Sequence, residues 1–401
     1  MAIALCLVVA GICPMPALAS GTASPWPPKM ITGSGNELVL RGNFQFDLER
    51  HGARSGAATA LANVNAWRRR ELGLSWRMRS GFGVQLGYDF NTRSAAQVTG
   101  WTDNFIRYGA PKLGEFRIGQ FKTPVGWDAA LSSSASTFLE TALPAQTANM
   151  GRRIGIDWNS QLGQHWRMQS AWYQGGDLNG DNDGHGPALR LVWNPLAAAT
   201  AKDGAAAIDV VHLGLALSRE ERSASRNGRG QWLAPIARFR VRPEAGLTAL
   251  RLVDTGSLRD PGAIDRIGLE AAWLHGPWLL QSEVLRFSAQ PTGNPRFDGD
   301  GWYLSGAWTL TGESRSYRNG AIGSLQPRGE LGALELALRL SHVDLDDGPV
   351  RGGTQTDWTF GANWYVTKFF KLQANHVWGR SERAGVRSRP RILELRAQFA
   401  F

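Results

Sequence analysis

The chain has 401 residues and carries 44 Lys and Arg against 34 Asp and Glu, which gives a formal net charge of +10. Hydrophobic residues make up 43% of the chain and charged residues 19%, a balance that excludes general disorder. Both cysteines, Cys6 and Cys13, lie close to the start, so the rest of the chain can form neither a disulfide framework nor a cysteine zinc site.

Residues 1–19 have the pattern of a secretory signal peptide. An apolar run extends from Ala2 to Ile12, and Ala17-Leu18-Ala19 supplies the small residues that precede a cleavage site. No Lys or Arg precedes the apolar run, so the true start of the chain stays open, and a buried apolar strand is the alternative interpretation. Residues 20–36 are expected to form a flexible N-terminal segment because prolines cluster there.

Residues 37–401 contain no uninterrupted run of apolar residues long enough for a transmembrane helix, which excludes a helical inner-membrane protein. The dominant pattern is instead a strict alternation with a period of two. Leu334, Leu336, Leu338 and Leu340, for example, alternate with polar or small residues. Similar alternation in the segments 38–48, 72–79, 82–90, 358–366, 370–378 and 393–401 predicts many half-buried strands, roughly 16 to 18 in all.

Such alternation fits either a soluble sandwich or a transmembrane barrel, and three features favour the barrel. The segments are about ten residues long, the length that spans a bilayer when tilted. The chain ends on the aromatic residue Phe401, within an alternating segment. Tryptophans lie near segment ends, as the aromatic girdles of a membrane barrel require. The sequence therefore predicts an all-β fold, a transmembrane antiparallel β-barrel, with girdle residues Trp26, Trp101, Trp166, Trp302, Trp358 and Trp378.

Several motifs occur in a specific order. Residues 116–125 are Phe-Arg-Ile-Gly-Gln-Phe-Lys-Thr-Pro-Val, and 137–140 are Thr-Phe-Leu-Glu. Gly-Trp-Tyr-Leu follows at 301–304, and Asp-Trp-Thr-Phe-Gly-Ala-Asn-Trp-Tyr at 357–365. From about residue 36 to the end, the chain resembles the phosphate-selective porin family (porin O and P) of Gram-negative outer membranes.

The resemblance implies a barrel of 16 strands, a homotrimer, and loops that narrow the pore. It also implies passive uptake of anions, plausibly phosphate or polyphosphate. The terminal Phe401, which the family shares, is expected to be part of the signal read by the barrel-assembly machinery. One position departs from the family, because Thr141 stands where many relatives carry a basic residue. Strict phosphate selectivity is therefore left open.

The residues themselves suggest how anions would pass. A pore must replace the hydration of an ion with donors that hold it only weakly, and the planar guanidinium of arginine suits oxyanions. Alternation places Arg238, Arg240 and Arg242 on one side of a predicted wall strand, with Phe239 and Val241 facing lipid. The same parity predicts that further basic residues face the lumen: Arg41, Arg77, Arg79, Lys371 and Arg396. A GC-rich genome, or contacts with anionic headgroups, would also explain abundant arginine.

Residues 122–153 form the best candidate for a constriction loop. The segment joins two strand signals, is rich in Ser, Thr and Ala, and shows no alternation, and a loop this long is usually functional. Folded into the barrel, it would bring Lys122, Arg152 and Arg153 to the anion path. An external loop packed at the trimer axis is the alternative.

Other functions find less support in the sequence. Residues 176–184 resemble a calcium loop, but the Glu expected at the twelfth position of such a loop is missing. None of the seven histidines lies in a nucleophile motif, so no enzyme activity is predicted, and no cofactor or metal. The sequence predicts an outer-membrane porin with small anions and outer-membrane lipid as partners and no nucleic acid. A general porin and a closed structural or adhesive barrel are the alternatives.

Overall fold

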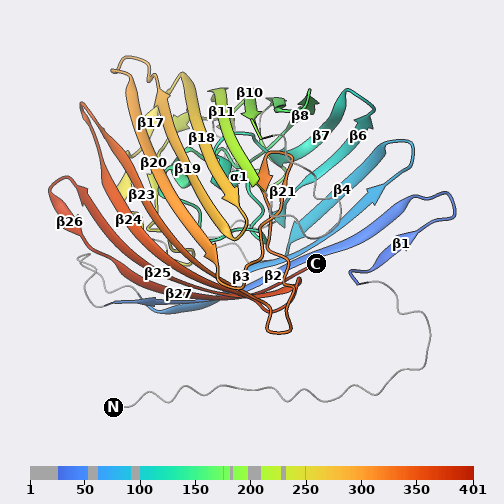
Figure 1. Cartoon of the computed structure of the whole chain (residues 1–401). Helices are drawn as coiled ribbons and strands as arrows, with labels where there is room; N and C mark the ends of the chain where they lie inside the picture. Colours follow the sequence, from blue (N-terminus) through green and yellow to red (C-terminus); the bar gives the residue numbers. More distant parts are fainter. Residues whose placement is uncertain are drawn as a thin grey trace, which may run out of the picture.

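In the computed structural model, sixteen long antiparallel strands close into one barrel (Figure 1). The structure describes residues 26–52, 62–91, 100–174, 176–180, 184–196, 209–226, 232–248 and 250–401. Strand β2 pairs with β27 from Asn43↔Ala400 to His51↔Ile392, which closes the ring. The predicted transmembrane barrel is thus confirmed, whereas the predicted signal peptide lies outside the described residues. The wall strands are β2 (Glu37–His51), β3 (Val64–Arg77), β4 (Phe82–Asp89), β6 (Asn104–Ala110), β7 (Gly114–Lys122), β8 (Arg152–Leu162), β9 (Trp166–Tyr173), β10 (Gly186–Trp193), β11 (Asp209–Glu221), β18 (Ala263–His275), β19 (Trp278–Ala289), β20 (Phe297–Thr309), β23 (Ala333–Asp347), β24 (Val350–Tyr365), β25 (Phe370–Arg383) and β27 (Arg391–Ala400).

Shorter elements extend the wall or lie in the loops. Three of them pair with wall strands: β1 (Lys29–Ile31), β5 (Gly100–Trp101) and β26 (Val386–Ser388). The loop between β7 and β8 contains two short helices, α1 (Trp127–Ala130) and α2 (Leu143–Ala148). Short strands also occur in the loops that follow β11 and β20: β12 (Ser225–Arg226), β13 (Trp232–Leu233), β14 (Ile236–Ala237), β15 (Arg240–Val241), β16 (Val253–Asp254), β17 (Leu258–Arg259), β21 (Tyr317–Arg318) and β22 (Ala321–Ile322).

The outer surface of the barrel is an apolar band. On β23, Leu334, Leu336 and Leu338 are 42%, 47% and 39% exposed, whereas Glu335 and Arg339 on the opposite side of the strand are buried inside the barrel. This is the arrangement of a membrane barrel, in which lipid contacts the apolar face and polar residues line the interior. The leucines therefore face outward as predicted. Among the described residues, no helix has both the length and the apolar character needed to span a membrane.

Tryptophans border the apolar band on both sides. On β24, the outward-facing Trp358 stands at one edge of the band and Trp364 at the other. Trp302 and Trp308 have the same relation on β20. Because the strands continue beyond the band on the side of the long loops, a tryptophan can mark the edge of the membrane without ending its strand. Exposed tryptophans at the predicted positions are Trp26, Trp101, Trp166, Trp302, Trp358 and Trp378.

Trp26 and β1 lie beside the C-terminal residue Phe401 at the closing seam. β1 pairs with residues 37–39 of β2, and the ring of Trp26 lies 4.9 Å from that of Phe401, centroid to centroid. Phe401 continues the β27 ladder, because its backbone N–H donates to the carbonyl of Gly42 and its carbonyl accepts from the N–H of Gly42, each at 2.9 Å. The flexibility predicted for residues 20–36 stays a prediction. From Trp26 onward, the segment has a strand partner and an aromatic contact that are distant in sequence.

Deletion of Phe401 should reduce the folded form of the protein. The deletion removes the last ladder hydrogen bonds to Gly42 and the ring that contacts Trp26. The measurement is the fraction that migrates as the folded, heat-modifiable species on a gel. Trp26→Ala removes the ring contact and leaves the C-terminal residue in place, so it separates packing from recognition by the assembly machinery. Unchanged assembly after the deletion would contradict the prediction.

Candidate functional site

The barrel interior contains two chambers of similar size. The loop-side chamber has a volume of about 440 Å³ and includes residues from the long loop after β11, such as Arg240 and Arg251. The turn-side chamber, about 450 Å³, includes Lys368 in the β24–β25 turn and the terminal Phe401. The chambers share five lining residues and therefore meet at their level. We call this set the junction: Arg69, Lys122, Ala130, Ser133 and Arg152.

Residues 123–151, which we call the inner loop, start and end on β7 and β8 but bond to the far side of the barrel. Asn363 of β24 donates its side-chain N–H to the carbonyl of Thr137 at 2.8 Å. Lys371 of β25 donates to the carbonyl oxygens of Ser134 and Ser136 at 3.2 and 3.1 Å. The inner loop therefore crosses the lumen, and α1 lies within the ring of strands in Figure 1.

Lys122 fastens the tip of the inner loop from the near side. Its Nζ donates to the carbonyl oxygens of Ala129 and Leu131 at 2.9 and 2.7 Å, at the C-terminal end of α1. Carbonyls at the end of a helix lack partners within the helix, and a cation there also suits the helix dipole. At the other end of the inner loop, α2 begins with Pro144 in its first turn, where proline needs no N–H donor.

The buried Arg339 of β23 connects the inner loop to the long loop 222–262. Its guanidinium donates to the carboxylate of Glu244 at 2.8 and 2.5 Å and to the carbonyl of Glu140 at 2.7 Å. Ser341 and Thr359 also donate to Glu244, at 2.5 and 2.6 Å. The long loop is thus fixed to the wall through a single carboxylate that accepts from three wall side chains, and the inner loop through the carbonyl of Glu140.

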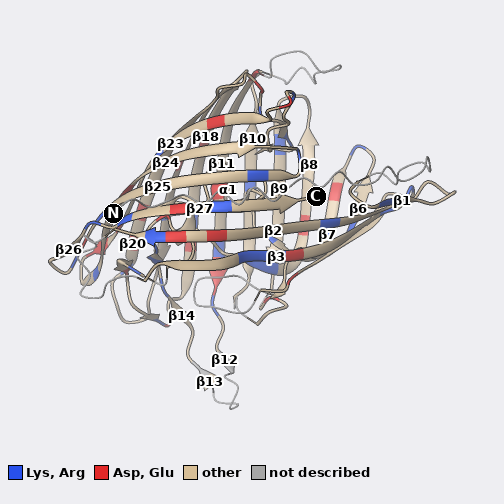
Figure 2. Ribbon diagram, turned by 90° about the horizontal axis from the view of Figure 1, so that it is seen from below, with Lys and Arg blue, Asp and Glu red and all other residues tan. Residues whose placement is uncertain are grey.

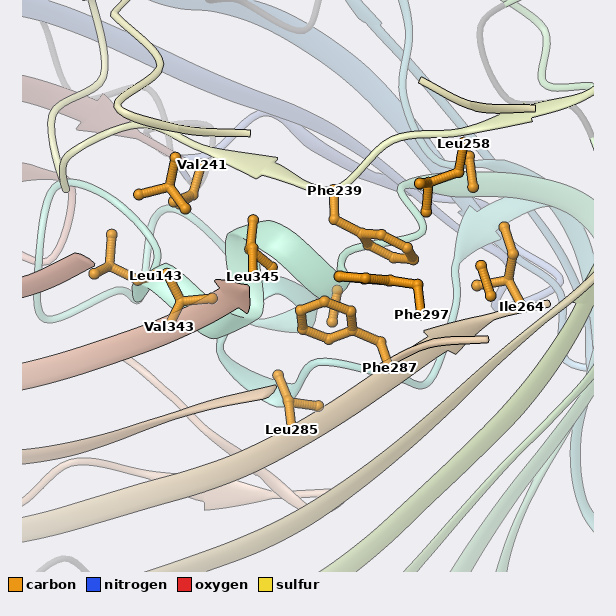
Figure 3. Close-up of a cluster of buried hydrophobic side chains, with 14 of the residues drawn as sticks. Leu143, Phe239, Val241, Leu258, Ile264, Leu285, Phe287, Phe297, Val343 and Leu345 are labelled. Carbon is orange, nitrogen blue, oxygen red and sulfur yellow. The ribbon is translucent and has the colours of Figure 1, made fainter. Parts of the chain in front are cut away.

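The prediction that Arg238, Arg240 and Arg242 occupy a wall strand is wrong. They lie in the loop 222–262, and Phe239 does not face lipid: its ring stacks at 4.7 Å on Phe287 and at 5.5 Å on Phe297 inside the barrel (Figure 3). Val241 is buried in the same cluster. The alternation is real, but its apolar side covers an apolar patch on the inner wall. Arg240 and Arg242 line the loop-side chamber, whereas Arg238 is ion-paired with Asp254 and lines neither chamber.

The structure separates the other predicted basic residues into two groups. Lys122 and Arg152 lie at the junction, Arg41 and Lys371 line the turn-side chamber, and Arg396 lines the loop-side chamber. The remaining three line neither chamber. Arg77 ends β3 on the turn side, and the backbone N–H of Arg79 donates to Asn36 just beyond it. Arg153 is buried against Glu220, at 2.9 Å.

Sequence reasoning missed Arg68 and Arg69, which both line the loop-side chamber. On an ideal strand, consecutive residues face opposite sides, but a bulge opposite Gln45 and Phe46 interrupts the ladder: Gln45 pairs with Arg69 and Phe46 with Trp67. The extra residue in β3 brings both arginines to the inside. The sequence signal for lumen-facing arginines on β3 was the run Trp67-Arg68-Arg69-Arg70, because at least one of three adjacent arginines must face the lumen.

Basic side chains predominate in both chambers. Nine basic and three acidic residues line the loop-side chamber, and six basic and two acidic residues line the turn-side chamber. Figure 2 shows the charged residues along β2, β3 and β27. Several arginines have acidic partners, such as Arg152 with Asp103 at 2.8 Å and Arg68 with Glu140 at 3.0 Å. Basic residues still outnumber acidic ones among the lining residues of each chamber.

Two ionisable groups in the loops remain charged at neutral pH. Burial raises the pKa of Glu140, but Arg68 and Arg396 together outweigh it and bring that pKa down to about 2. Burial and the neighbouring guanidinium groups of Arg242 and Arg240 lower the pKa of Arg251 to about 10. At pH 7 Glu140 is therefore a carboxylate, and Arg251 keeps its proton.

The possible calcium loop gains no support. Asn179 caps the backbone of Trp101 instead, accepting from its N–H at 2.8 Å and donating to its carbonyl at 2.8 Å. Residues 181–183 of the proposed loop lie outside the described residues. Across the described part of the chain, no group of three or more His, Cys, Asp or Glu side chains is arranged to hold a metal ion.

Comparison with known proteins places this barrel in a family. Residues 39–401 match the family model of the phosphate-selective porin O and P. The chain belongs to that family. Porin O of Pseudomonas aeruginosa is 34% identical over 130 residues, which cover 29% of this chain and 30% of that protein. An uncharacterized protein of Caulobacter vibrioides is 25% identical over 368 residues, 86% of this chain and 69% of its own length.

Solved structures support the same fold. The porin is similar to OmpT of Vibrio cholerae, with a TM-score of 0.57 and 11% identity over 91% of this chain and 99% of that chain. An anion-selective porin from Comamonas acidovorans gives a TM-score of 0.57 at 11% identity over 91% of this chain and all of that chain. Family and fold together make the protein an outer-membrane porin.

Proposed function

We propose that this porin lets small anions, phosphate-like oxyanions among them, diffuse down their gradient along an arginine-lined path. The observation that carries the proposal is the excess of basic side chains at three successive levels. Arg240 and Arg251 line the loop-side chamber, Arg69 and Arg152 the junction, and Arg41 the turn-side chamber. A wall of low dielectric focuses their field and raises the local anion concentration, and several weak sites in series permit fast conduction.

We propose conduction rather than a closed structural or adhesive barrel, because the two chambers lie next to each other and share lining residues at the junction. The contacts of the lining side chains favour weak binding of anions. Arg152 is held by Asp103 and Lys122 by backbone carbonyls, so neither offers its full hydrogen-bonding capacity to an ion. Thr141, an uncharged residue of the loop-side chamber, adds no donor charge. We therefore propose modest discrimination between phosphate and other small anions, with a general porin as the second candidate.

The assembly in the membrane completes the proposal. The signal pattern supports removal of residues 1–19 during export. The terminal Phe401 supports insertion by the barrel-assembly machinery. The exposed leucines support contact of the apolar band with outer-membrane lipid. We propose a homotrimer, in line with the trimer form described for OmpT of Vibrio cholerae.

Single-channel recording tests the anion path. Adding phosphate to a chloride solution should lower the single-channel current of the wild-type porin, because the two anions compete for the same basic side chains. Arg240→Gln combined with Arg242→Gln should lower the anion-over-cation permeability ratio, although only modestly, since salt screens charges beyond ~10 Å at 0.1 M. Arg238→Gln is the matched control, because Arg238 lines neither chamber. An unchanged ratio in the double variant, or an equal loss in the control, would contradict the proposed path.

A further inference from the structure

A buried cluster of three arginines surrounds one carboxylate outside both chambers. Glu220 Oε1 lies 2.9 Å from Nη2 of Arg153 and 2.8 Å from Nε of Arg222, and Oε2 lies 2.8 Å from Nη1 of Arg266. The side chains of Glu220, Arg153 and Arg266 are 0%, 1% and 4% exposed, and that of Arg222 is 24% exposed. None of the four lines the anion path proposed above.

The four residues come from the places where both internal loops join the wall. Arg153 is the second residue of β8, directly after the inner loop, and Arg222 is the first residue after β11, at the start of the loop 222–262. Arg266 lies on the next wall strand, β18, opposite Ser218 in the ladder. Gly184 covers the carboxylate: a Cβ added to it would lie 2.8 Å from Glu220 Oε1. A ligand bound here would therefore contact the places where both internal loops join the wall.

The charges of the cluster do not balance. Among the described residues, three guanidinium groups face one carboxylate, which leaves an excess of two positive charges in a site largely closed to water. Buried charges without counterions are strongly unfavourable, and buried donors without partners call for a bound water or ion. Nε of Arg153, Nε of Arg266 and the hydroxyl of Ser218 have no hydrogen-bond partner among the described residues. Both arginines contact the carboxylate of Glu220, and Ser218 lies opposite Arg266 in the ladder.

We propose that this cluster binds a small doubly charged oxyanion, of which hydrogen phosphate is the probe. Two negative charges would balance the two excess positive charges. The free guanidinium N–H groups and the Ser218 hydroxyl supply the donors that tetrahedral oxygens accept, in charge-assisted bonds. The site is separate from the permeation path, and its occupancy stabilises the attachment of both internal loops.

The test is the temperature at which the folded, heat-modifiable form is lost in detergent, measured while phosphate replaces chloride at constant ionic strength. A ligand that binds only the folded state raises this temperature. The wild-type porin should gain about 3 °C or more at saturating phosphate. Sulfate, which has the same charge and shape, should act similarly. No shift with either oxyanion would overturn the proposal and leave ordered water as the occupant.

Three variants locate the site. Arg222→Gln, at the partly exposed edge, should weaken the apparent phosphate affinity roughly tenfold or more, the effect of one charged hydrogen bond. Glu220→Gln should act in the opposite direction and tighten binding, because it removes the competing negative charge. Arg219→Gln is the matched control, since that exposed neighbour pairs with Asp265 instead. A shift unaffected by Arg222→Gln would place the bound phosphate elsewhere and overturn the assignment.

Permeation variants separate this site from the pore. Arg240→Gln with Arg242→Gln should keep the full thermal shift while changing the channel current. If that double variant instead abolishes the shift, the phosphate binds in the lumen and the cluster around Glu220 is not its site. The thermal experiment reports on the cluster even if the channel shows no anion preference, so the two proposals can fail independently.

Discussion

Arg339→Gln is expected to cause the largest loss of stability of any single change in the barrel interior. Arg339 is 1% exposed, and its guanidinium holds Glu244 and the carbonyl of Glu140, so the change leaves a buried carboxylate without its main partner. Breaking a buried ion pair in this way costs about 3–5 kcal/mol. The measurement is the temperature at which the heat-modifiable form disappears. We also expect noisier single-channel currents, because both internal loops lose their contacts with Arg339 of β23.

A surface ion pair provides the control for this prediction. Arg387 pairs with Glu382 at 2.9 Å, and their side chains are 74% and 50% exposed. Exposed pairs contribute only about 0–1 kcal/mol, so Arg387→Gln should leave the transition almost unchanged. Adding Glu244→Gln to the Arg339 variant should restore part of the loss, since the unpaired charge is then removed. Equal effects of Arg339→Gln and Arg387→Gln would show that the buried network does not hold the loops.

Arg69→Glu combined with Arg152→Glu should reverse the ion preference of the channel. Three basic side chains line the junction, and the double change leaves Lys122 beside two new carboxylates. Asp103, which lines the turn-side chamber, also loses its partner Arg152, so that guanidinium no longer offsets its negative charge. An ion that passes the junction comes close to these side chains. Salt therefore screens the charges of the junction less than it screens charges farther from the ion. The reversal potential in a salt gradient measures the change.

The matched control makes the same change of charge outside the chambers. Arg77→Glu with Arg79→Glu places two carboxylates at the turn end of β3 and should shift the reversal potential only slightly. Folding is checked by heat-modifiable migration of both double variants. An Arg69 and Arg152 variant that still prefers anions, or a control that shifts as far, would show that the junction does not set the selectivity.

The wall of the barrel was predictable from the sequence because each wall strand carries its own local signal. Leu334, Leu336 and Leu338 reveal their outward side by period alone, since lipid accepts one face and the interior the other. Once the alternating segments are predicted to form one closed barrel, pairing of the first and last wall strands, β2 and β27, follows. Register and bulges depend on the neighbouring strand, so the inward turn of both Arg68 and Arg69 could not be read from β3 by itself.

The interior was harder to predict because its contacts are distant in sequence. Phe239 and Val241 alternate with arginines as a wall strand would, yet the apolar surface that they cover belongs to β19, β20 and the inner loop. Arg153 and Arg238 were predicted to line the pore, but they contact Glu220 and Asp254 instead and line neither chamber. Parity identifies which side chains share a face. It does not identify whether that face meets lipid, water or another segment of the same chain.

The zero-current potential of the wild-type porin in a planar bilayer tests the central claim most directly. With a tenfold gradient of potassium chloride, an anion-preferring pore lets chloride move toward the dilute side faster than potassium. The account therefore predicts stepwise channel currents and a dilute side that becomes negative, because basic side chains predominate in both chambers. A dilute side that becomes positive, or a membrane without conductance steps, would contradict it.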